Sequence, residues 1–388
     1  MHLSSASFGY PDVDGTHRAD LAGRLRGKKP PSNTFILATC LRIEVAVRGS
    51  REDLERAVAG VFGESTVMDL ATVRVGERAV EHLFRIAAGL ESPILGEREI
   101  LGQFRQSVQA TREGGVAADG LFSKLLDTAV SVGRQARQLL PESPHDSMAA
   151  VAAQVVGGAP RVAVFGSGSI AKSAVTGLLG LPAPPEVTVV ARDPGKVSFS
   201  GITVLSLDLA EKVLDEFPAV ISATSAKQRL VADRRLADVL AARSTLLTLV
   251  DMAMPPDFSP PSDSEVQYVN IDDLARMADR RPRRDDADAM VTTAAADAYR
   301  HLTNHMSVGP VIGGLIQTAD GIVERVVARF TGRLKNTEDR AVLEQTAHTV
   351  ARTLLAGPVA YIKAPDRPRD SLDVIAEAFG VEEDSDGR

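Results

Sequence analysis

The sequence predicts an α/β protein of three domains, and three observations support this prediction. The chain has 388 residues, enough for about two to four domains of ordinary size. In its middle third, short apolar strands alternate with helical stretches, as in a parallel sheet wound with helices. The last third keeps a helical period and shows no strands. We therefore expect an N-terminal α+β domain over residues 1–150, a doubly wound domain over 151–270 and an all-helical domain over 271–388.

The composition is that of a globular protein with aliphatic cores. Hydrophobic residues make up 44% and charged residues 24% of the chain, while aromatic residues reach only 4% and tryptophan is absent. The net charge of −7 argues against non-specific binding of polyanions by the whole surface. No apolar run reaches the ~18 residues of a membrane helix, and the first residues do not resemble a secretory signal. We expect a cytoplasmic protein that does not contact a membrane.

The chain contains a single cysteine, Cys40. One cysteine excludes a disulfide within the chain and a zinc site made of cysteines, and we predict no metal centre. A strand-like run over 34–38 precedes Cys40, and an alternating segment over 43–47 follows it. The cysteine is therefore expected at a connection between strands, a common place for functional residues. Residues 1–32 show no clear pattern, and helical spacing begins at Glu52.

The doubly wound part begins with a predicted strand over 161–165 and a glycine-rich turn. The turn, Gly166-x-Gly168-x-x-Ala171, leads into a helix, which is the context of a dinucleotide-binding motif. Its glycines permit a tight turn and a close pyrophosphate, which the helix N-terminus favours. The motif predicts a Rossmann-type domain, and a turn that binds no nucleotide is the alternative. The predicted cofactor-binding residues are Gly166, Ser167, Gly168, Ser169, Ile170, Ala171, Arg192 and Thr224.

The end of the second strand bears on the choice of cofactor. NAD sites usually carry an acidic residue there, which holds the ribose 2′-hydroxyl. Here the strand over 187–190 is followed by Arg192 and Asp193. A guanidinium can pair with a 2′-phosphate through two hydrogen bonds. We therefore favour NADPH, with Asp193 as the argument for NADH.

The helical third contains one interruption. Pro282 lies in the basic cluster 280–284 and should end or kink a helix there. Beyond it, apolar residues keep a helical spacing over 311–364. An amphipathic helical end of this kind permits self-association.

Two interpretations of Cys40 follow from the residues alone. A lone cysteine is often a small buried hydrophobe. Alternatively, Arg42, two residues away, could stabilise a thiolate or bind a carboxylate. A thiolate that attacks an activated acyl group gives a thioester, which a nicotinamide hydride can reduce to an aldehyde. The predicted nucleotide turn favours this second interpretation.

Several segments carry a resemblance to one family. Thr39-Cys40-Leu41-Arg42-Ile43-Glu44 resembles the Thr-Cys-Asn-Arg-x-Glu segment of glutamyl-tRNA reductases. The block from His82 to Gln103 looks like the longest signature of that family. The nucleotide turn follows in the expected order, as do the segments 222–225, 251–257 and 270–274. The helical end, with Pro310 and Pro358, is similar to the family's dimerisation domain.

The resemblance implies an activity and a set of residues. Cys40 would attack the ester of glutamyl-tRNA, and NADPH would reduce the resulting thioester to glutamate 1-semialdehyde, the first step of C5-pathway tetrapyrrole synthesis. Arg42 would hold the side-chain carboxylate, and His82 would be a second catalytic residue that donates or accepts a proton. A homodimer and a downstream glutamate-1-semialdehyde aminotransferase are also implied. The implied substrate-binding residues are Thr39, Leu41, Arg42, Ser92, Glu97, Arg98, Glu99 and Gln103.

Some of these residues have plainer interpretations. Ser92 could cap a helix, Glu97 could be an exposed helix charge, and His82 could be a core or surface histidine. The basic cluster 280–284 could bind tRNA phosphates, although a solvated loop is favoured.

The sequence departs from the family near the substrate. Leu41 replaces asparagine, Glu99 replaces glutamine, and the family's N-terminal segment is not recognisable in residues 1–30, where His17-Arg18-Ala19 is a weak match. Pro282 falls where the family has one long helix. An enzyme that reduces a different aminoacyl-tRNA is therefore one alternative. A non-catalytic paralogue that binds tRNA or an enzyme is a second, and an NADPH dehydrogenase for a free small molecule is a third. The retained arginine of the cysteine motif favours an acidic side chain.

Overall fold

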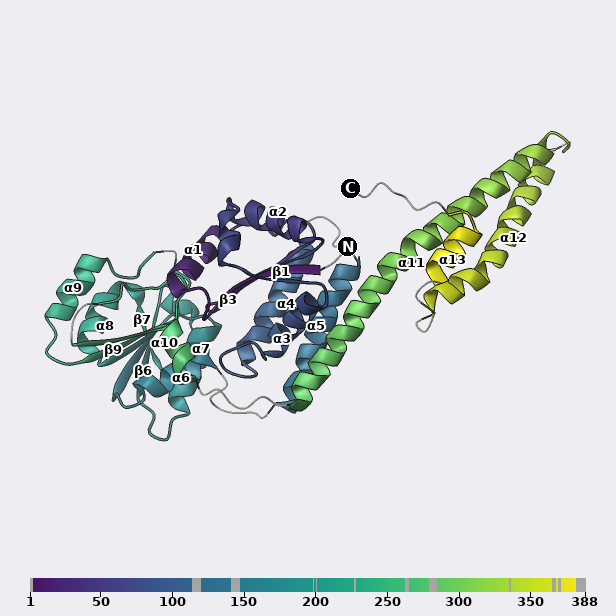
Figure 1. Cartoon of the computed structure of the whole chain (residues 1–388). Coiled ribbons are helices and arrows are strands. Elements are labelled where there is room, and N and C mark those ends of the chain that lie inside the picture. Colours follow the sequence, from purple (N-terminus) through teal and green to yellow (C-terminus); the bar gives the residue numbers. More distant parts are fainter. Residues whose placement is uncertain are drawn as a thin grey trace. The chain divides into compact units, whose positions relative to one another are not determined.

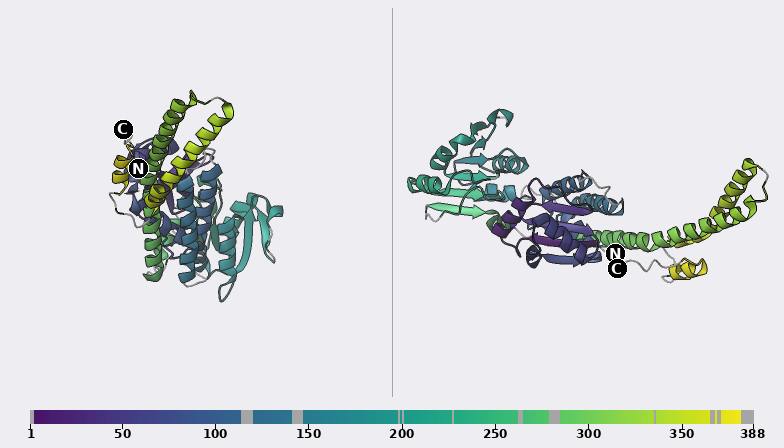
Figure 2. Two further views of the ribbon diagram at one scale, coloured as in Figure 1. Left: turned by 90° about the vertical axis from the view of Figure 1, so that its right-hand side faces the viewer. Right: turned by 90° about the horizontal axis from the view of Figure 1, so that it is seen from above.

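The computed structural model describes residues 3–113, 120–140, 147–197, 199, 201–226, 228–261, 265–278, 285–334, 336–364, 368 and 371–381. The chain divides into two compact units, Met1–Tyr299 and Arg300–Arg388, which are described one at a time (Figures 1 and 2). The predicted break at Pro282 and the basic cluster around it lie outside the described residues.

The first unit contains a four-stranded antiparallel sheet in the order β2-β3-β1-β4. The two strands predicted on either side of Cys40 are confirmed as β2 and β3. The sequence pattern misses β1, although it is a central strand, because its serines make it look polar. Two of them, Ser4 and Ser5, are fully buried. The strands are β1 (Leu3–Gly9), β2 (Thr34–Ala38), β3 (Arg42–Arg48) and β4 (Thr72–Val75).

Helices cover both faces of this sheet. α1 (Gly15–Leu25) and α2 (Arg51–Phe62) share one apolar core with the strands, to which Ile36 of β2 contributes. Phe35 points to the opposite face, because successive side chains of a strand alternate, and its ring lies 4.8 Å from that of Phe104 in α4. The helices that pack together on that second face are α3 (Glu77–Ala88), α4 (Arg98–Glu113) and α5 (Gly120–Leu139).

The second sheet is parallel, with six strands in the order β10-β9-β8-β5-β6-β7. Counted from β5, this is the 3-2-1-4-5-6 order of dinucleotide-binding domains, with the change of direction between β5 and β8. The predicted Rossmann-type fold is thus confirmed, with β10 as a strand that the sequence pattern does not predict. The strands are β5 (Arg161–Phe165), β6 (Glu186–Ala191), β7 (Thr203–Ser206), β8 (Ala219–Ser222), β9 (Leu247–Asp251) and β10 (Val266–Asn270).

Two apolar cores sandwich the parallel sheet. One core contains side chains from α6 (Met148–Val156), α7 (Ser169–Leu179) and α10 (Ile271–Met277). The other contains side chains from α8 (Ala210–Glu216) and α9 (Asp233–Ala241). Because α10 packs against α6 and β10, it belongs with this sheet. Short 3-10 turns occur at Thr66–Leu70, Pro194–Lys196 and Leu207–Leu209.

The second unit is helical, as the sequence predicts. α11 (Asp285–Thr331) contains the boundary between the units, and α12 (Thr337–Lys363) and α13 (Ser371–Ala378) follow it. A small core joins the three helices. Its buried members are Val308, Leu315, Ile362 and Leu372.

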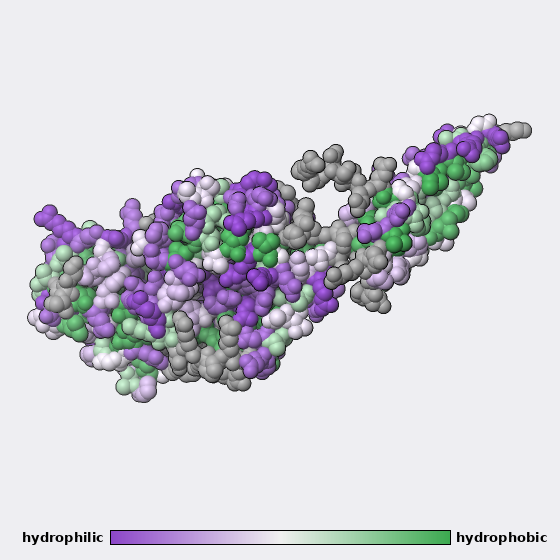
Figure 3. All heavy atoms as spheres, viewed as in Figure 1, coloured by the Kyte–Doolittle hydropathy of each residue, from purple (hydrophilic) through white to green (hydrophobic). Residues whose placement is uncertain are grey.

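Apolar side chains also lie exposed along these helices, at helical spacing. Figure 3 shows hydrophobic side chains gathered on this unit. A contiguous apolar surface of this kind marks an interaction site. The exposed side chains are Ile316, Ile322, Val326 and Phe330 of α11 and Val342, Val350, Leu354 and Tyr361 of α12.

Among the described helices, α11 alone is long and apolar enough, by length and composition, to cross a membrane. One such helix is weak evidence for a membrane span, because long helices of other proteins pass the same test. The expectation of a chain that does not contact a membrane stays a prediction.

Candidate active site

Cys40 lies in the tight connection between β2 and β3. The Thr39 hydroxyl accepts hydrogen bonds from the N–H groups of Leu41 (3.2 Å) and Arg42 (3.1 Å), and the Thr39 N–H donates to the Arg42 carbonyl (2.8 Å). A threonine suits this turn, because its hydroxyl can bond the backbone two and three residues further on. The turn holds Cys40 near its tip, with the side chain half-buried.

One small cavity, of about 20 Å³, is lined by Cys40 and most of the predicted substrate-binding residues. The Rossmann-type domain contributes to the same cavity through Met148, Ala149, Ile170 and Met252. Of the predicted set, Arg98 is missing from the lining, and its side chain lies outside the part of the chain that the structure describes. The predicted residues that line it are Thr39, Cys40, Leu41, Arg42, Ser92, Glu97, Glu99 and Gln103.

The structure decides between the interpretations of Ser92 and Glu97, and it also places Leu41. Ser92 does not cap a helix, because it lies in the turn between α3 and α4, and its hydroxyl hydrogen-bonds with Glu97. Glu97 is not an exposed helix charge, because it precedes α4 and lines the cavity. Leu41 is buried in the apolar core of α6 and α7, where it packs with Ile94 and Met148.

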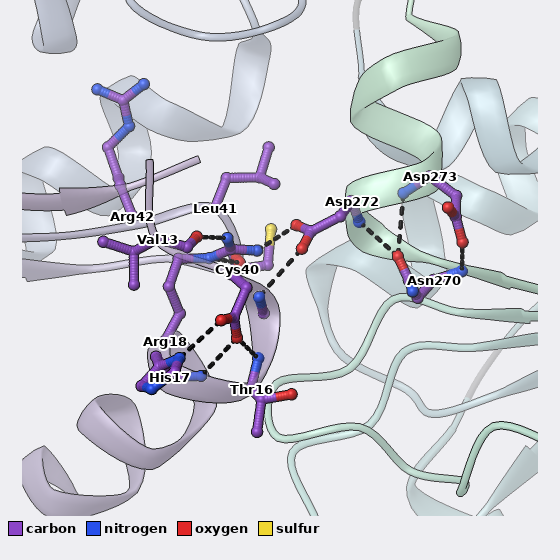
Figure 4. A network of polar contacts seen from close by, with 12 residues as sticks. Val13, Thr16, His17, Arg18, Cys40, Leu41, Arg42, Asn270, Asp272 and Asp273 are labelled. Carbon is purple, nitrogen blue, oxygen red and sulfur yellow. Dashed lines mark hydrogen bonds and ion pairs between the residues drawn. The ribbon is translucent and has the colours of Figure 1, made fainter. Parts of the chain in front are cut away.

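Burial keeps the Cys40 thiol protonated. Protein atoms around the thiol raise the pKa of Cys40 to about 12, and the negative charges of Glu97 and Glu99 add to this effect. The positive charge of Arg18 opposes it. Arg42 is not among the main charges that act on the thiol, and Figure 4 shows its guanidinium directed away from Cys40. Of the two roles expected for Arg42, this placement favours carboxylate binding.

Glu97 is the titratable group best suited to exchange a proton in this cavity. Burial and the negative charge of Glu99 raise the pKa of Glu97 to about 7, although Ser92 and Arg42 oppose the shift. A carboxyl group that titrates near neutral pH can accept a proton from one group and return it to another. Glu99 also contacts the other domain, because its Oε1 accepts a hydrogen bond from the Ser173 hydroxyl at 3.1 Å.

Arg42 also borders a second cavity, of about 560 Å³, which His82 helps to line. Ser92 and Pro93 line both cavities. His82 is not among the residues that line the Cys40 cavity. The structure therefore does not bring the two predicted catalytic residues into one cavity. The second cavity is polar, with Ser7, Asp12, Thr72, Arg74 and Glu91 among its lining residues.

Ion pairs hold the His82 ring. Its Nε2 lies 3.1 Å from Oε2 of Glu44, and its Nδ1 lies 3.5 Å from Oε1 of Glu91. Burial disfavours the charged imidazole, but the two carboxylates outweigh burial and raise the pKa of His82. Burial likewise disfavours the Glu91 carboxylate, but His82, Arg42 and Arg85 outweigh it and lower the pKa of Glu91 to about 2. His82 is thus a buried member of a charge network.

A third cavity, of about 480 Å³, opens beside the glycine turn and the segment after β8. Gly166 has φ +117°, and a Cβ there would stand 2.5 Å from the Ala223 carbonyl oxygen, so this position requires glycine. A Cβ on Gly168 would meet nothing within 4 Å, so the turn faces open space at the start of α7. A pyrophosphate fits such a cradle.

All but one of the predicted cofactor-binding residues line this cavity. The exception is Ala171, which is fully buried and packs against the turn. Lys172 and Lys196 add positive charge to the lining, and the Asp193 carboxylate lies 3.3 Å from the Lys196 ammonium. The predicted residues that line it are Gly166, Ser167, Gly168, Ser169, Ile170, Arg192 and Thr224.

Ile170 lines both the nucleotide cavity and the Cys40 cavity. The two cavities therefore adjoin at one side chain, in the first turn of α7. A cofactor whose phosphates rest on the glycine turn would extend toward Cys40.

Sequence reasoning missed three polar residues of this region, Arg18, Arg74 and Glu91. Arg18 is fully buried, which no residue pattern indicates for an arginine. Arg74 lies on β4, an element that the sequence pattern does not predict. Glu91 lies inside the signature block from His82 to Gln103, and its position in that block could have indicated a functional role.

A Rossmann-type domain whose cofactor cavity adjoins a second, cysteine-containing cavity defines a nicotinamide-dependent oxidoreductase. Three family models match the chain: the N-terminal domain of glutamyl-tRNAGlu reductase over residues 13–139, shikimate / quinate 5-dehydrogenase over 150–277, and the dimerisation domain of glutamyl-tRNAGlu reductase over 286–381. The two models of the one reductase together cover more than half of the chain. The chain belongs to the glutamyl-tRNA reductase family.

Relatives match along nearly the whole length. The chain is 26% identical to the glutamyl-tRNA reductase of Staphylococcus epidermidis, over 98% of its own length and 94% of the relative's. It is 29% identical to that of Caldivirga maquilingensis, over 91% and 88%. The solved structure of glutamyl-tRNA reductase from Methanopyrus kandleri is 22% identical, with 98% of this chain and 99% of that chain covered and a TM-score of 0.49.

Proposed function

We propose that this chain reduces glutamyl-tRNA to glutamate 1-semialdehyde with NADPH, through a thioester on Cys40. This reaction is the first step of the C5 route to tetrapyrroles. The observation that carries the proposal is the junction at Ile170 between the nucleotide cavity and the Cys40 cavity. Hydride transfer requires the donor to reach the acyl group on sulfur, so the two must bind in adjacent cavities.

In the first step, the Cys40 sulfur bonds to the carbonyl carbon of the aminoacyl ester, and the bond from that carbon to the terminal ribose oxygen breaks. Because the thiol is protonated at neutral pH, a base must take its proton during the attack. Glu97 shares the cavity and titrates near neutral pH, so it accepts this proton and returns it to the ribose oxygen.

The amino acid's side-chain carboxylate binds toward the second cavity. Arg42 borders both cavities, and Arg74 adds a second guanidinium to the lining of the larger one. The Nη1 atom of Arg74 is buried and has no hydrogen-bond partner among the described residues. Two guanidinium groups in one cavity favour an acidic side chain.

When bound, NADPH would supply the hydride that adds to the thioester carbonyl carbon, and breakage of the carbon–sulfur bond would then give the aldehyde and release the Cys40 thiolate. The glycine turn would hold the pyrophosphate. Arg192, with Lys172 and Lys196 in the same lining, would hold the 2′-phosphate. The pairing of Asp193 with Lys196 leaves that carboxylate less available for a ribose hydroxyl.

The partners follow from the same proposal. The chain forms a homodimer through its helical unit, as the dimerisation-domain match and the exposed apolar side chains support. Charged tRNA is the substrate, in the cytoplasm, and an aminotransferase consumes the aldehyde. The net charge of −7 implies that tRNA binding is sensitive to salt.

The test is a panel of charged tRNAs with the purified protein, followed by NADPH oxidation and by identification of the aldehyde. We expect turnover with glutamyl-tRNA and none with free glutamate. Cys40→Ser should lose at least about a thousandfold in turnover, because the nucleophile is removed, and should keep its affinity for the tRNA. Unchanged turnover of this variant would exclude the thioester mechanism.

A second candidate is an enzyme of the same chemistry that reduces a different aminoacyl-tRNA. Leu41 favours it, because an aliphatic side chain lines the cavity where the family has an amide. Turnover with another member of the panel, and none with glutamyl-tRNA, would establish this candidate instead.

A further inference from the structure

α1 joins the N-terminal domain to the Rossmann-type domain at both of its ends. At its start, the Gly15 N–H donates to Oδ2 of Asp272 at 3.1 Å. At its end, the Arg26 guanidinium donates to the carbonyl oxygens of Ala226 (3.2 Å) and Met254 (2.9 Å). These three partners follow β10, β8 and β9, so α1 lies across the carboxyl edge of the parallel sheet. Cofactors bind at that edge in folds of this class.

Arg18, in the middle of this contact, is fully buried and bonded on three sides. Its guanidinium pairs with Oδ1 of Asp272 and donates to the Val13 carbonyl. Its Nε donates to the carbonyl oxygen of Cys40 at 3.4 Å. Figure 4 shows these three partners around one side chain. One guanidinium therefore connects the backbone of the nucleophile turn to the Rossmann-type domain.

Asp272 is itself held firmly. It lies in the first turn of α10, and its neighbours Asn270 and Asp273 form a reciprocal cap at that helix start. Among the described residues, Asp272 is the only carboxylate paired with Arg18. A buried guanidinium that loses its one counter-charge must move or take in water, because an unpaired buried charge is costly.

We propose that Arg18 and Asp272 form a positioning pair, which sets the Cys40 turn at the distance from the cofactor cavity that reduction of the thioester requires. The inference rests on the proposed thioester chemistry. Neither residue touches the substrate or the cofactor in this proposal. The pair acts through the Cys40 carbonyl, and the positive charge of Arg18 also favours the thiolate.

The first test uses Asp272→Asn, which keeps the size of the side chain and removes its charge. The cofactor-free protein is alkylated with iodoacetamide, which reports on Cys40 alone because the chain has no other cysteine. We expect alkylation to become about fivefold faster than in the parent protein, because a loosened turn opens more often.

The second test measures what becomes of the acyl group. Each molecule of thioester ends either as aldehyde, after reduction, or as free amino acid, after attack by water. With saturating NADPH and charged tRNA, Asp272→Asn should form the thioester within about twofold of the parent rate. Its ratio of aldehyde to free amino acid should fall about tenfold, since small displacements slow a reaction between two bound groups.

Asp272→Glu serves as the charge-retaining variant, and Glu211→Gln as the matched control, because Glu211 forms an exposed pair with Arg235 in the same domain. Asp272→Glu should recover part of the product ratio, and Glu211→Gln should leave both readouts unchanged. Parental alkylation and product ratio in Asp272→Asn would overturn the proposal. So would an equal loss of thioester formation and reduction, together with a lowered unfolding temperature, since that is the result of a purely structural role. A parent that forms no thioester with any charged tRNA would instead refute the proposed function, and the alkylation test would still judge the pair.

Discussion

The two cavities that meet at Arg42 favour opposite protonation states of their carboxyl groups: one favours the neutral form and the other the charged form. In the Cys40 cavity, burial raises the pKa of the thiol and of Glu97, so both groups hold protons that they can exchange. In the second cavity, ion pairs raise the pKa of His82 and lower the pKa of Glu91 to about 2, so that both groups favour their charged forms. The Cys40 cavity therefore suits proton transfer, and the second cavity suits the binding of a charged side chain. From this difference we infer that the acid–base chemistry of the proposed reaction takes place beside the thiol, and that His82 has a supporting role.

After the loss of the Cys40 nucleophile itself, the largest expected effect concerns Glu97. Glu97→Gln should slow thioester formation about a hundredfold, the usual contribution of a positioned acid or base. In the parent protein the rate should rise with pH and level off above about 7, where the Glu97 carboxylate is ionised. The variant should lack this inflection. The measurement is rapid-quench detection of acylated protein between pH 5.5 and 8.5, which extends about one and a half pH units on either side of the pKa of Glu97.

Glu99→Gln is the matched control for that experiment. It removes the negative charge that helps to raise the pKa of Glu97, so the inflection should move to lower pH while the plateau rate is kept. An inflection that stays near pH 7 in Glu97→Gln would mean that another group takes the proton.

Stability should report on the same carboxyl group. The folded pKa of Glu97 lies above its ordinary value, so protonated Glu97 favours the folded state below pH 4.5, and this contribution is lost as pH rises through about 7. Glu97→Gln should therefore flatten part of the decline in unfolding free energy between pH 4.5 and 7. Denaturant unfolding of both proteins across that range is the measurement. Equal slopes would argue against the raised pKa.

The second cavity should respond through substrate affinity. Arg74→Gln should raise KM for the charged tRNA about fivefold and leave kcat nearly unchanged, because a contact made equally in the ground and transition states affects binding alone. Arg78→Gln, on helix α3, is the control. It removes one positive charge, as Arg74→Gln does, but Arg78 does not line the cavity. Steady-state kinetics with both variants will show whether the side-chain carboxylate lies near Arg74.

The smallest expected effect on the reaction belongs to His82, whose loss should act on stability instead. His82→Gln should lower the unfolding free energy by about 1–3 kcal/mol at pH 6, because the buried Glu44 carboxylate loses one of its charged partners and keeps the Ser7 hydroxyl and Arg42. Since the folded pKa of His82 is raised, the stability it adds is present below its ordinary value of 6.5 and is lost as pH rises through the folded pKa. The difference between parent and variant should therefore shrink by pH 8.5. A large fall in thioester formation at constant stability would instead make His82 a participant in the chemistry.

Much of the fold could be predicted from residue patterns. The glycine turn with its flanking strand and helix predicted the Rossmann-type domain, because tight turns and buried strands have local causes. The strand β1 could not be recognised, because its buried serines give it a polar local pattern. Its place at the centre of the sheet comes from backbone pairing with β3 and β4, which lie far away in the chain. The pairing of Arg18 with Asp272 was equally hidden, since 254 residues separate the two partners.

The sequence by itself determined the family, the nucleotide turn, the place of Cys40 between two strands and most of the cavity that surrounds it. Only the tertiary structure decided that His82 lies in a different cavity, that Arg18 and not Arg42 is among the main charges acting on the thiol, and that Leu41 packs into a core. The physical reason is the range of the interactions. Turns and strand alternation depend on neighbours in the chain, whereas burial and charge depend on whichever residues folding brings within a few ångströms.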